Sequence, residues 1–341
     1  MKILYCVAGV GFGNTARALA ILPHLRGHEV QVVGPPRVVA RLSSLCPVVA
    51  LEAFEYPASD RLEGFELLLK LPRFLSLYRR NSVLYERLLD SFRPDLVVAD
   101  SDVYVLRPAR KRGIPIAAIN QSPAVAGFYS EEKIPPGHRL SYYGLERMDL
   151  WTVLRACARV VVPSFADAPV VGNGKIKRVP LVSRFSSPLP PPPRQGRTIV
   201  LLGGSAIVPS LDPSSLGADV EVAGAAPPSS WPVRYLGFVE DLPRLLSDAA
   251  AVIALGGLST LGDLAALRRP AVVVPIPGHA EQWANACLFE QTGYGVRGTA
   301  ATLRRDLARY RENYGSFLEA MSAHSLTGAK EAAAALLEAA A

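Results

Sequence analysis

Residues 255–286 limit the possible folds of this chain more than any other stretch. An apolar strand ends there in two glycines, a helix begins at Ser259 and Thr260, and a second apolar strand follows at residues 271–274 before a polar loop. Strand–helix–strand units of this kind build parallel sheets, whose ligands bind outside the carboxyl ends of the strands. Both loops of the stretch are therefore expected to face one crevice.

The amino-terminal end has the same pattern. Residues 2–8 form an apolar run, a glycine-rich loop follows at residues 9–13, and residues 15–25 have the apolar spacing of a helix before a second strand. This order predicts a βαβ unit. The loop lacks the dinucleotide fingerprint, because Asn14 replaces its third glycine and the second strand ends in glycine and proline instead of an acidic residue. The sequence therefore does not predict an NAD site.

The length of 341 residues accommodates two domains, and the proline-rich run SSPLPPPPRQG marks a boundary between them. We expect a first Rossmann-like domain at residues 1–185, a linker at 186–197, a second Rossmann-like domain at 198–320, and a helix at 321–341 that packs back on the first domain. The second domain opens with a strand and a glycine pair, as the first does. The predicted fold class is α/β, with two Rossmann-like domains facing across a cleft.

The charge balance favours an anionic partner. Lys and Arg number 37 against 30 Asp and Glu, a formal net charge of +7. This excess fits a phosphate-rich ligand, an acidic membrane surface or nucleic acid, and also a merely solvated surface. Residues 65–80 interleave apolar and basic side chains, which is typical of a surface that lies on anionic lipid and equally of amphipathic helices packed on a sheet.

Cysteine usage and hydropathy give further limits. The 4 cysteines form no C-x-x-C pair, so neither a zinc site nor a disulfide framework is indicated, and a reducing cytoplasm is expected. No apolar run of about 18 residues occurs, so we expect no membrane-spanning segment.

Polar side chains follow the predicted strand at residues 94–99 of the first half. They include Asp100 and Asp102, which would reach the carboxyl edge of the sheet. Residues 130–151 mix prolines, tyrosines and glycines without a clear period, so we expect an irregular segment that forms an acceptor pocket. Residues 159–162 are predicted to be the last strand of this half.

The loops of the second half suit a diphosphate. Gly257, Ser259 and Thr260 lie at a helix start, where free N–H groups and the positive end of the helix dipole converge. Ser205, on the facing glycine loop, offers a hydroxyl donor. The structural alternative is a capping box between Thr260 and Asp263.

Other side chains of the same loops suit a sugar nucleotide. Asp263 lies one turn into the helix and can accept hydrogen bonds from ribose hydroxyls, and Glu281 and Gln282 can hold the hydroxyls of a sugar. Gly203 and Gly204 let a ligand approach the backbone closely, although a simple turn also explains them.

The order and spacing of these motifs resemble GT-B glycosyltransferases that use UDP-sugars, and are similar to MurG transferases of peptidoglycan synthesis and to UDP-glucuronosyltransferase-like enzymes. The resemblance covers nearly the whole chain and is strongest at the amino terminus and in residues 199–300. The motifs that carry it are Gly203-Gly204-Ser205, Gly237-Phe238 with Asp241, Gly256-Gly257-x-x-Thr260-x-x-Asp263, Glu281-Gln282-x-x-Asn285-Ala286 and, near the start, Gly11-Phe12-Gly13-Asn14-x-x-Arg17.

The resemblance implies a donor site in the second domain and an acceptor that enters from the first. By this analogy the backbone around Phe238 contacts uracil, Asp263 holds the ribose, the helix start holds the diphosphate, and Glu281 with Gln282 holds the sugar. The implied donor-binding residues are Gly203, Gly204, Ser205, Gly237, Phe238, Val239, Gly257, Ser259, Thr260, Asp263, Glu281 and Gln282, and those on the acceptor side are Gly11, Phe12, Gly13 and Arg17.

Three positions depart from the family pattern. Asn14 stands where several branches have a histidine that deprotonates the acceptor, and an amide cannot act as a base. Asp263 replaces a glutamate, and Leu255 replaces a histidine or arginine that would donate to the phosphates. A base must then come from elsewhere. Asp102 is the first candidate and Asp100 the second, because Asp100 is expected to cap the next helix.

We therefore expect an inverting, metal-independent transfer of a hexose or N-acetylhexosamine from a UDP-sugar to a hydroxyl acceptor, without a cofactor. The expected acceptor is lipid-linked, the protein is expected in the cytoplasm and peripheral on the inner face of the cell membrane, and nucleic acid is not an expected partner. The alternatives are a non-catalytic sugar-nucleotide-binding subunit, a UDP-sugar epimerase of the same architecture, and a metal-dependent GT-A enzyme whose D-x-D would be Asp100-Ser101-Asp102.

Overall fold

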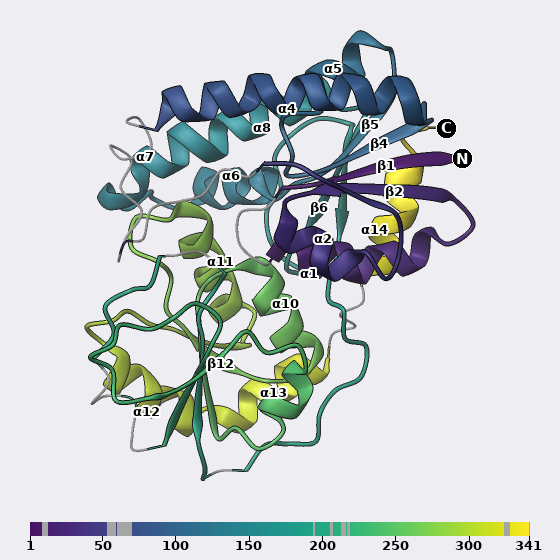
Figure 1. Ribbon diagram of the computed structural model, residues 1–341. Helices are drawn as coiled ribbons and strands as arrows, with labels where there is room; N and C mark the ends of the chain where they lie inside the picture. The colour runs from purple at the N-terminus through teal and green to yellow at the C-terminus, as the bar shows by residue number, and fades with distance from the viewer. Residues whose placement is uncertain are drawn as a thin grey trace.

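The protein folds into two lobes, each a parallel β-sheet flanked by helices (Figure 1). The computed structural model describes residues 1–8, 13–52, 59, 70–193, 195–204, 207–212, 216, 219–323 and 328–340. The predicted α/β class with two Rossmann-like domains is confirmed. The sheet of the first lobe runs in the order β3 (Val48–Ala50), β2 (Glu29–Gly34), β1 (Lys2–Val7), β4 (Leu96–Asp100), β5 (Ile116–Ile119), β6 (Arg159–Pro163) and β7 (Ile176–Val179).

Parallel register brings the carboxyl ends of the central strands to one edge of this sheet. Val7 of β1 pairs with Asp100 of β4, and Asp100 pairs in turn with Ile119 of β5. The loops that follow these three strands therefore emerge side by side, although they are far apart in the sequence.

Helices cover both faces of the first sheet, because the side chains of a strand alternate between its faces. Ile3, Tyr5 and Val7 pack on one side with α1 and α14, whereas Leu4 and Cys6 pack on the other with α4 and α5. The helices of this lobe are α1 (Gly13–Ile21), α2 (Pro36–Leu42), α4 (Leu71–Phe92), α5 (Leu106–Lys111), α6 (Ser122–Glu131) and α8 (Arg147–Ala156), together with α14 (Gly328–Leu337).

The second lobe repeats the architecture with a smaller sheet. Its strands run in the order β10 (Arg234–Gly237), β9 (Val220–Ala223), β8 (Thr198–Leu201), β11 (Ala251–Ala254), β12 (Ala271–Val273) and β13 (Gly295–Arg297). Its helices are α9 (Leu242–Leu246), α10 (Leu258–Ala266), α11 (Ala280–Gln291), α12 (Leu303–Glu312) and α13 (Tyr314–Ser322). Because β8 lies between β9 and β11, the glycine loop after β8 opens at the centre of the sheet edge.

The C-terminal helix α14 lies on the first lobe, beside α1 and β6 (Figure 1). Ala332, Ala333 and Leu336 are buried in the same core as Val161 of β6. Small side chains on one helix face let α14 approach the sheet closely.

Gly328 begins α14 where the chain passes Pro180, and a Cβ at this position would lie 2.0 Å from the Pro180 carbonyl oxygen. We expect Gly328→Ala to lower the free energy of unfolding by about 1–3 kcal/mol, as overpacking does, in urea denaturation. The control is Gly315→Ala in α13, where an added Cβ meets nothing within 4 Å. That variant should gain up to about 1 kcal/mol of helix propensity. Equal stability of the two variants would contradict this account.

The segment at residues 130–151 is helical, so the prediction of an irregular excursion is wrong. After α6 come η2 (Pro136–His138), α7 (Arg139–Ser141), a π-helical turn η3 (Tyr142–Glu146) and then α8. Tertiary contacts hold these aromatic residues, since the rings of Tyr129 and Tyr142 meet edge to face with centroids 4.9 Å apart. Exposed apolar side chains, among them Leu140, Tyr143, Met148 and Trp151, break the helical period, which hid the helices in the sequence.

Two element boundaries also differ from the prediction. β7 follows residues 159–162, which were expected to be the last strand of the first half, and pairs with β6 at the sheet edge. Its two exposed central residues, Lys177 and Arg178, gave it no apolar signature. The sequence predicts one helix over residues 303–321, whereas the structure divides this range into α12 and α13 at Asn313, whose side chain donates to the carbonyl of Arg309.

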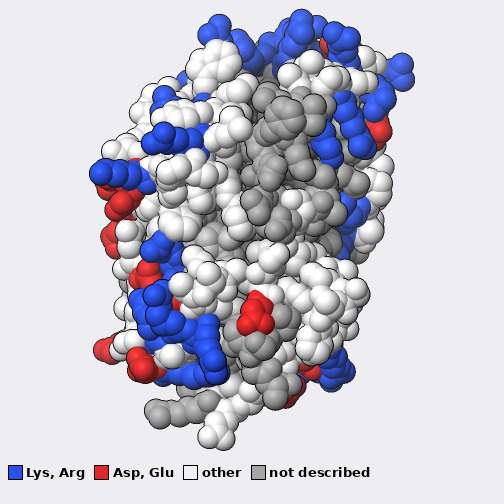
Figure 2. Space-filling model, turned by 90° about the vertical axis from the view of Figure 1, so that its left-hand side faces the viewer, with Lys and Arg blue, Asp and Glu red and all other residues white. Residues whose placement is uncertain are grey.

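Helix α4 packs through one face and exposes the other. Its buried residues Leu77, Tyr85 and Leu89 face the sheet, whereas Leu71 and Leu75 are about half exposed. Lys and Arg predominate over Asp and Glu at the top of the face shown in Figure 2, the end of the molecule that carries α4 and α5 in Figure 1. Across the described part of the chain, no helix is both long and apolar enough to cross a membrane.

Candidate active site

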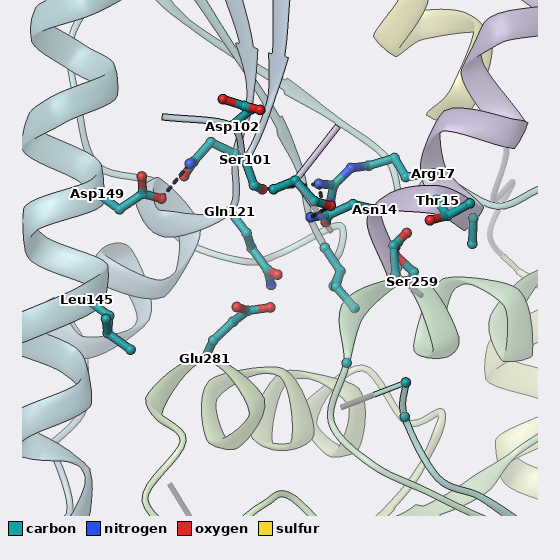
Figure 3. Close-up of a pocket in the computed structure, with 18 of the residues that line it drawn as sticks. Asn14, Thr15, Arg17, Ser101, Asp102, Gln121, Leu145, Asp149, Ser259 and Glu281 are labelled. Carbon is teal, nitrogen blue, oxygen red and sulfur yellow. Dashed lines mark hydrogen bonds between the residues drawn. The ribbon is translucent and has the colours of Figure 1, made fainter. Parts of the chain in front are cut away.

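A cavity of about 1730 Å³ lies between the two lobes. Asn14 lines it from the start of α1, Asp102 and Gln121 line it from the loops that follow β4 and β5, and Gly257 and Glu281 line it from the second lobe. Figure 3 shows side chains of both lobes converging on this space. The two loops of residues 255–286 therefore face one crevice, as their strand–helix–strand pattern predicts.

Several polar contacts join the lobes, and two of them involve residues at the cavity. The Ser259 hydroxyl donates to the carbonyl oxygen of Gly13 at 2.9 Å, and the Gln121 amide donates to the side-chain oxygen of Asn285. A Cβ at Gly13 would lie 3.2 Å from the Ser259 Oγ, so the glycine permits this approach. Of the predicted acceptor-side residues, Gly13 thus lies against the donor helix, while Gly11 and Phe12 lie outside the described residues.

The start of α10 presents free backbone donors to the cavity. Gly257 is its N-cap residue and provides no side-chain cap, and the first intrahelical bond runs from Leu261 N to Gly257 O at 3.1 Å. The N–H groups of residues 258–260 therefore have no acceptor within the helix, which is the arrangement that binds phosphate oxygens. Gly203, Gly204 and Thr260 line the same space, whereas Ser205 lies outside the described residues.

Gly256 allows the donor loop to lie directly against α11. A Cβ at this position would lie 2.3 Å from the carbonyl oxygen of Gln282. The Asn285 side chain also donates to the Gly256 carbonyl at 2.9 Å. Gly257 thus faces the ligand space, whereas Gly256 positions α11, the helix that carries Glu281.

Asp263 lines the cavity, but its carboxylate is bound by the chain that connects the lobes. The Ser183 hydroxyl donates to Oδ1 at 2.7 Å, and Arg184 Nε lies 3.4 Å from Oδ2. Burial raises the pKa of Asp263, and Arg184 opposes that shift. No capping box with Thr260 forms, because Gly257 is the N-cap of α10 and Thr260 lies inside the helix. A ribose at this position would share Asp263 with these two residues.

Asn14, Arg17 and Asp100 form one buried network. Arg17 makes an ion pair with Asp100, and its Nη2 also donates to Asn14 Oδ1 at 2.9 Å. Asn14 Nδ2 donates to the carbonyl of Ala8 at 3.1 Å, and the Tyr5 hydroxyl donates to Asp100 Oδ2 at 3.1 Å. The network holds Asn14 and Arg17 of α1 against the carboxyl ends of β1 and β4. Arg17, predicted on the acceptor side, is 7 % exposed, and its guanidinium is occupied by Asp100.

Asp102, not Asp100, bonds the backbone at the start of the next helix, so the expectation that Asp100 caps it is wrong. Asp102 Oδ1 accepts from the N–H groups of Tyr104 at 2.8 Å and Val105 at 3.3 Å. Its Oδ2 accepts from the Tyr85 hydroxyl at 2.7 Å. Burial raises its pKa to about 6, against these hydrogen bonds, which lower it. Both oxygens are therefore engaged in holding the loop.

Glu281 and Gln282 begin α11 at the cavity wall. Gln282 Oε1 accepts from the Ile276 N–H at 3.1 Å, which orients its amide. The N-cap His279 accepts from the Gln282 N–H, and burial lowers its pKa to about 4, so the ring is neutral and able to accept. Burial raises the pKa of Glu281, and the nearby Arg17 opposes that shift. The Glu281 side chain points into the cavity (Figure 3).

The predicted uracil-binding segment closes one end of the cavity. Gly237 has φ +69°, a conformation that favours glycine, and the turn places Phe238 and Val239 at the cavity wall. The Arg41 guanidinium of α2 lies 3.7 Å from the centroid of the Phe238 ring. This cation–π contact brings the two lobes together where a base would enter.

The structure adds polar residues that the sequence did not assign to the site. Asn120, Gln121 and Ser122 follow β5, and Glu146 and Asp149 come from η3 and α8, and all line the cavity. The first three were visible as a polar run after a predicted strand. The two carboxylates gave no signal, because they lie in the segment predicted to be irregular.

Comparison with known families supports a transferase. Residues 1–198 match the model of glycosyl transferase family 1, and residues 220–335 match the C-terminal domain of glycosyltransferase family 28. An uncharacterized glycosyltransferase of Methanosarcina acetivorans is 26% identical over 339 residues, covering 86% of this chain and 85% of that protein. The UDP-N-acetylglucosamine–N-acetylmuramyl-(pentapeptide) pyrophosphoryl-undecaprenol N-acetylglucosamine transferase of Lacticaseibacillus casei is 25% identical over 353 residues, covering 91% and 88%.

Solved structures agree on the fold. MurG of Acinetobacter baumannii superposes with a TM-score of 0.56 at 17% identity, covering 97% of this chain and 96% of that one. The Streptomyces glycosyltransferase SsfS6, complexed with thymidine diphosphate, gives 0.61 at 18% identity and covers 100% of both chains. Because the family 1 model matches more than half of the sequence, the chain belongs to glycosyl transferase family 1 and is a glycosyltransferase with the GT-B fold.

Proposed function

We propose that this glycosyltransferase moves a hexose or N-acetylhexosamine from a UDP-sugar to a hydroxyl acceptor, with inversion and without a metal ion or other cofactor. The observation that carries the proposal is the meeting, in one cavity, of the free N–H groups of α10, the Gly203-Gly204 loop and Glu281. The lobe that holds them matches a family 28 domain, and the Lacticaseibacillus relative is named for a UDP-sugar substrate.

The geometry suggests how the transfer proceeds. The acceptor oxygen attacks the anomeric carbon while the bond from that carbon to the diphosphate breaks, and the electron pair leaves with UDP. The N–H groups of residues 258–260 stabilise the charge that develops on the diphosphate. Glu281 and Gln282 hold the sugar, Phe238 and its neighbours hold the base, and Asp263 holds the ribose. A carboxylate on the first lobe takes the proton of the acceptor.

The contacts of Asp100 and Asp102 argue against the D-x-D alternative. A D-x-D site needs carboxylate oxygens that are free to face a metal bound to the diphosphate. Asp100 is paired with Arg17, and Asp102 is bound by Tyr85 and two backbone N–H groups. We expect transfer to persist in excess EDTA. A complete loss of activity in EDTA would support the metal-dependent mechanism instead.

A thermal-shift screen of nucleotides tests the donor assignment. UDP at about 100 times its dissociation constant should stabilise the protein by nearly 3 kcal/mol, as mass action requires, and GDP and ADP should stabilise it less. An unchanged melting temperature with every nucleotide would contradict the proposal. The screen needs no knowledge of the acceptor.

The acceptor is proposed to be lipid-linked and reached from the inner face of the cell membrane, where the protein would lie peripherally. Large apolar side chains from α4, α7 and α8 line the cavity and remain exposed, and we call this part of its wall the apolar limb. They include Leu71, Leu140, Met148 and Trp151, which are each about half exposed or more. The basic residues Arg107, Arg110, Lys111 and Arg155 line the same limb. Apolar and basic groups side by side suit an anionic lipid surface.

Vesicle binding tests this surface. We expect the protein to sediment with phosphatidylglycerol vesicles at low salt and to stay in solution with phosphatidylcholine, because both charge and apolar area contribute. Leu71→Gln with Leu75→Gln should weaken the binding several-fold. Leu45→Gln is the control, since Leu45 is equally exposed on another part of the first lobe. Equal binding to both vesicles, or equal loss in the control, would contradict the assignment.

A further inference from the structure

The geometry points to Asp149 as the catalytic base of the transfer, positioned by Asn120 and Ser122. This inference rests on the proposed function, because it names the group that removes the acceptor proton. It replaces Asp102, the candidate that the sequence favours.

Three carboxylates of the first lobe line the cavity: Asp102, Glu146 and Asp149. Asp102 already accepts three hydrogen bonds through both of its oxygens. Asp149 Oδ2 accepts from Asn120 Nδ2 at 2.5 Å and from the Ser122 hydroxyl at 2.9 Å. Its Oδ1 makes no hydrogen bond with any described residue. One oxygen of Asp149 is therefore held, and the other is available to an acceptor hydroxyl.

The partners of Asp149 are themselves oriented. The backbone N–H of Ser122 donates to Asn120 Oδ1 at 2.8 Å, so the amide nitrogen of Asn120 is the end that faces Asp149. Both partners lie at the carboxyl end of β5, a strand that is held between β4 and β6 inside the sheet. Such support from a rigid element keeps a base in place for proton transfer.

Glu146 is better suited to support than to accept a proton. Burial and the charges of Glu281 and Asp149 raise its pKa well above the usual range, which favours the protonated carboxyl. Its Oε2 lies 3.1 Å from the Ser122 hydroxyl. A protonated Glu146 donates to Ser122, and the single Ser122 proton is then directed to Asp149.

Asp149 also has the proton affinity that the step needs. Burial raises its pKa, and the bonds from Asn120 and Ser122 limit the rise. A raised pKa makes a carboxylate a stronger base. The ionisable groups that interact with it are Glu146, Glu281 of the other lobe and Cys157.

The position of Asp149 fits the path of the two substrates. It lies across the cavity from Glu281, the residue proposed to hold the donor sugar (Figure 3). Met148 and Trp151, on the same helix, are 64 % and 62 % exposed and begin the apolar limb. An acceptor with an apolar tail on that limb would present its hydroxyl at Asp149. The proton then passes from that hydroxyl to Oδ1 as the new glycosidic bond forms.

The test measures UDP release from UDP-N-acetylglucosamine, with water and a membrane lipid extract as acceptor sources. Asp149→Asn should lower the rate by at least about 10²-fold, the usual share of a general base, without changing the UDP dissociation constant in calorimetry. The matched control is Asp167→Asn, an exposed aspartate outside the cavity, which should leave the rate unchanged. Formate should restore activity to Asp149→Ala.

A pH profile separates catalysis from a structural role. The wild-type rate should rise with pH as Asp149 ionises, and this acid limb should vanish in Asp149→Asn. The hydrogen bond from Asn120 lowers the pKa of Asp149, so Asn120→Ala should raise that pKa and move the acid limb to higher pH. A rate within tenfold of wild type in Asp149→Asn would overturn the inference, and so would a loss of both the rate and the acid limb in Asp102→Asn. Neither result would contradict the proposed transferase function. Wild-type protein that neither binds UDP nor releases it would instead overturn the proposed function.

Discussion

Replacing Arg17 with methionine should lower the free energy of unfolding by about 3–5 kcal/mol, because it leaves the buried carboxylate of Asp100 without its partner. Asp100 is fully buried, and the only other side chain that bonds it among the described residues is Tyr5. A neutral hydroxyl cannot compensate an isolated charge in such a place. Urea unfolding followed by circular dichroism measures the effect.

Two comparisons show whether the loss is due to burial. Arg17→Met combined with Asp100→Leu should recover much of the stability, because no uncompensated charge remains. Lys111→Met removes an exposed ion pair with Glu86 and should cost at most about 1 kcal/mol. If Arg17→Met costs no more than Lys111→Met, the network does not anchor the start of α1 to the sheet. Arg17 would then be free for the acceptor role that the sequence resemblance implies.

Replacing Glu281 with alanine should lower kcat/KM for the UDP-sugar by about 10–100-fold and leave the affinity for UDP unchanged. A hydrogen bond to a charged group contributes about 1.5–3 kcal/mol, which corresponds to that range, and UDP lacks the sugar that Glu281 is proposed to hold. Steady-state kinetics and calorimetry with UDP measure the two effects separately.

The control for Glu281 lies on the same helix. Glu290 pairs with Arg297 and Arg309 outside the interlobe cavity, so Glu290→Ala changes a charge of α11 without touching the site. Its kcat/KM should stay within about twofold of wild type. A parallel loss of UDP affinity in Glu281→Ala would show that α11 has shifted, and would contradict a specific contact with the sugar.

The central strands and the position of the cleft could be predicted, because both follow from local patterns. The central strands of both sheets are buried on two faces and read as continuous apolar runs, and the glycines after β1, β8 and β11 mark where their loops open. Since the carboxyl ends of parallel strands meet at one edge, the site follows from the strand ends alone.

The side-chain partners inside the cleft could not be predicted, because they come from distant parts of the chain. Asp263 is bound by Ser183, 80 positions earlier, and Asp149 by Asn120, 29 positions earlier. No local sequence pattern predicts either contact. The expectation that Asp100 caps the next helix failed for the same reason, since the partners of Asp100 and Asp102, Arg17 and Tyr85, come from other helices.

Product analysis tests the proposed transfer most directly. The wild-type protein is incubated with UDP-N-acetylglucosamine or UDP-glucose and a membrane lipid extract, and the products are examined by mass spectrometry and by NMR of the anomeric proton. The account predicts free UDP and a glycosylated lipid with a β-linkage, the inverse of the α-linked donor, in the presence of EDTA. An α-linked product would contradict inversion, and a UDP-sugar that is only epimerised, or bound without any product, would contradict the transfer itself.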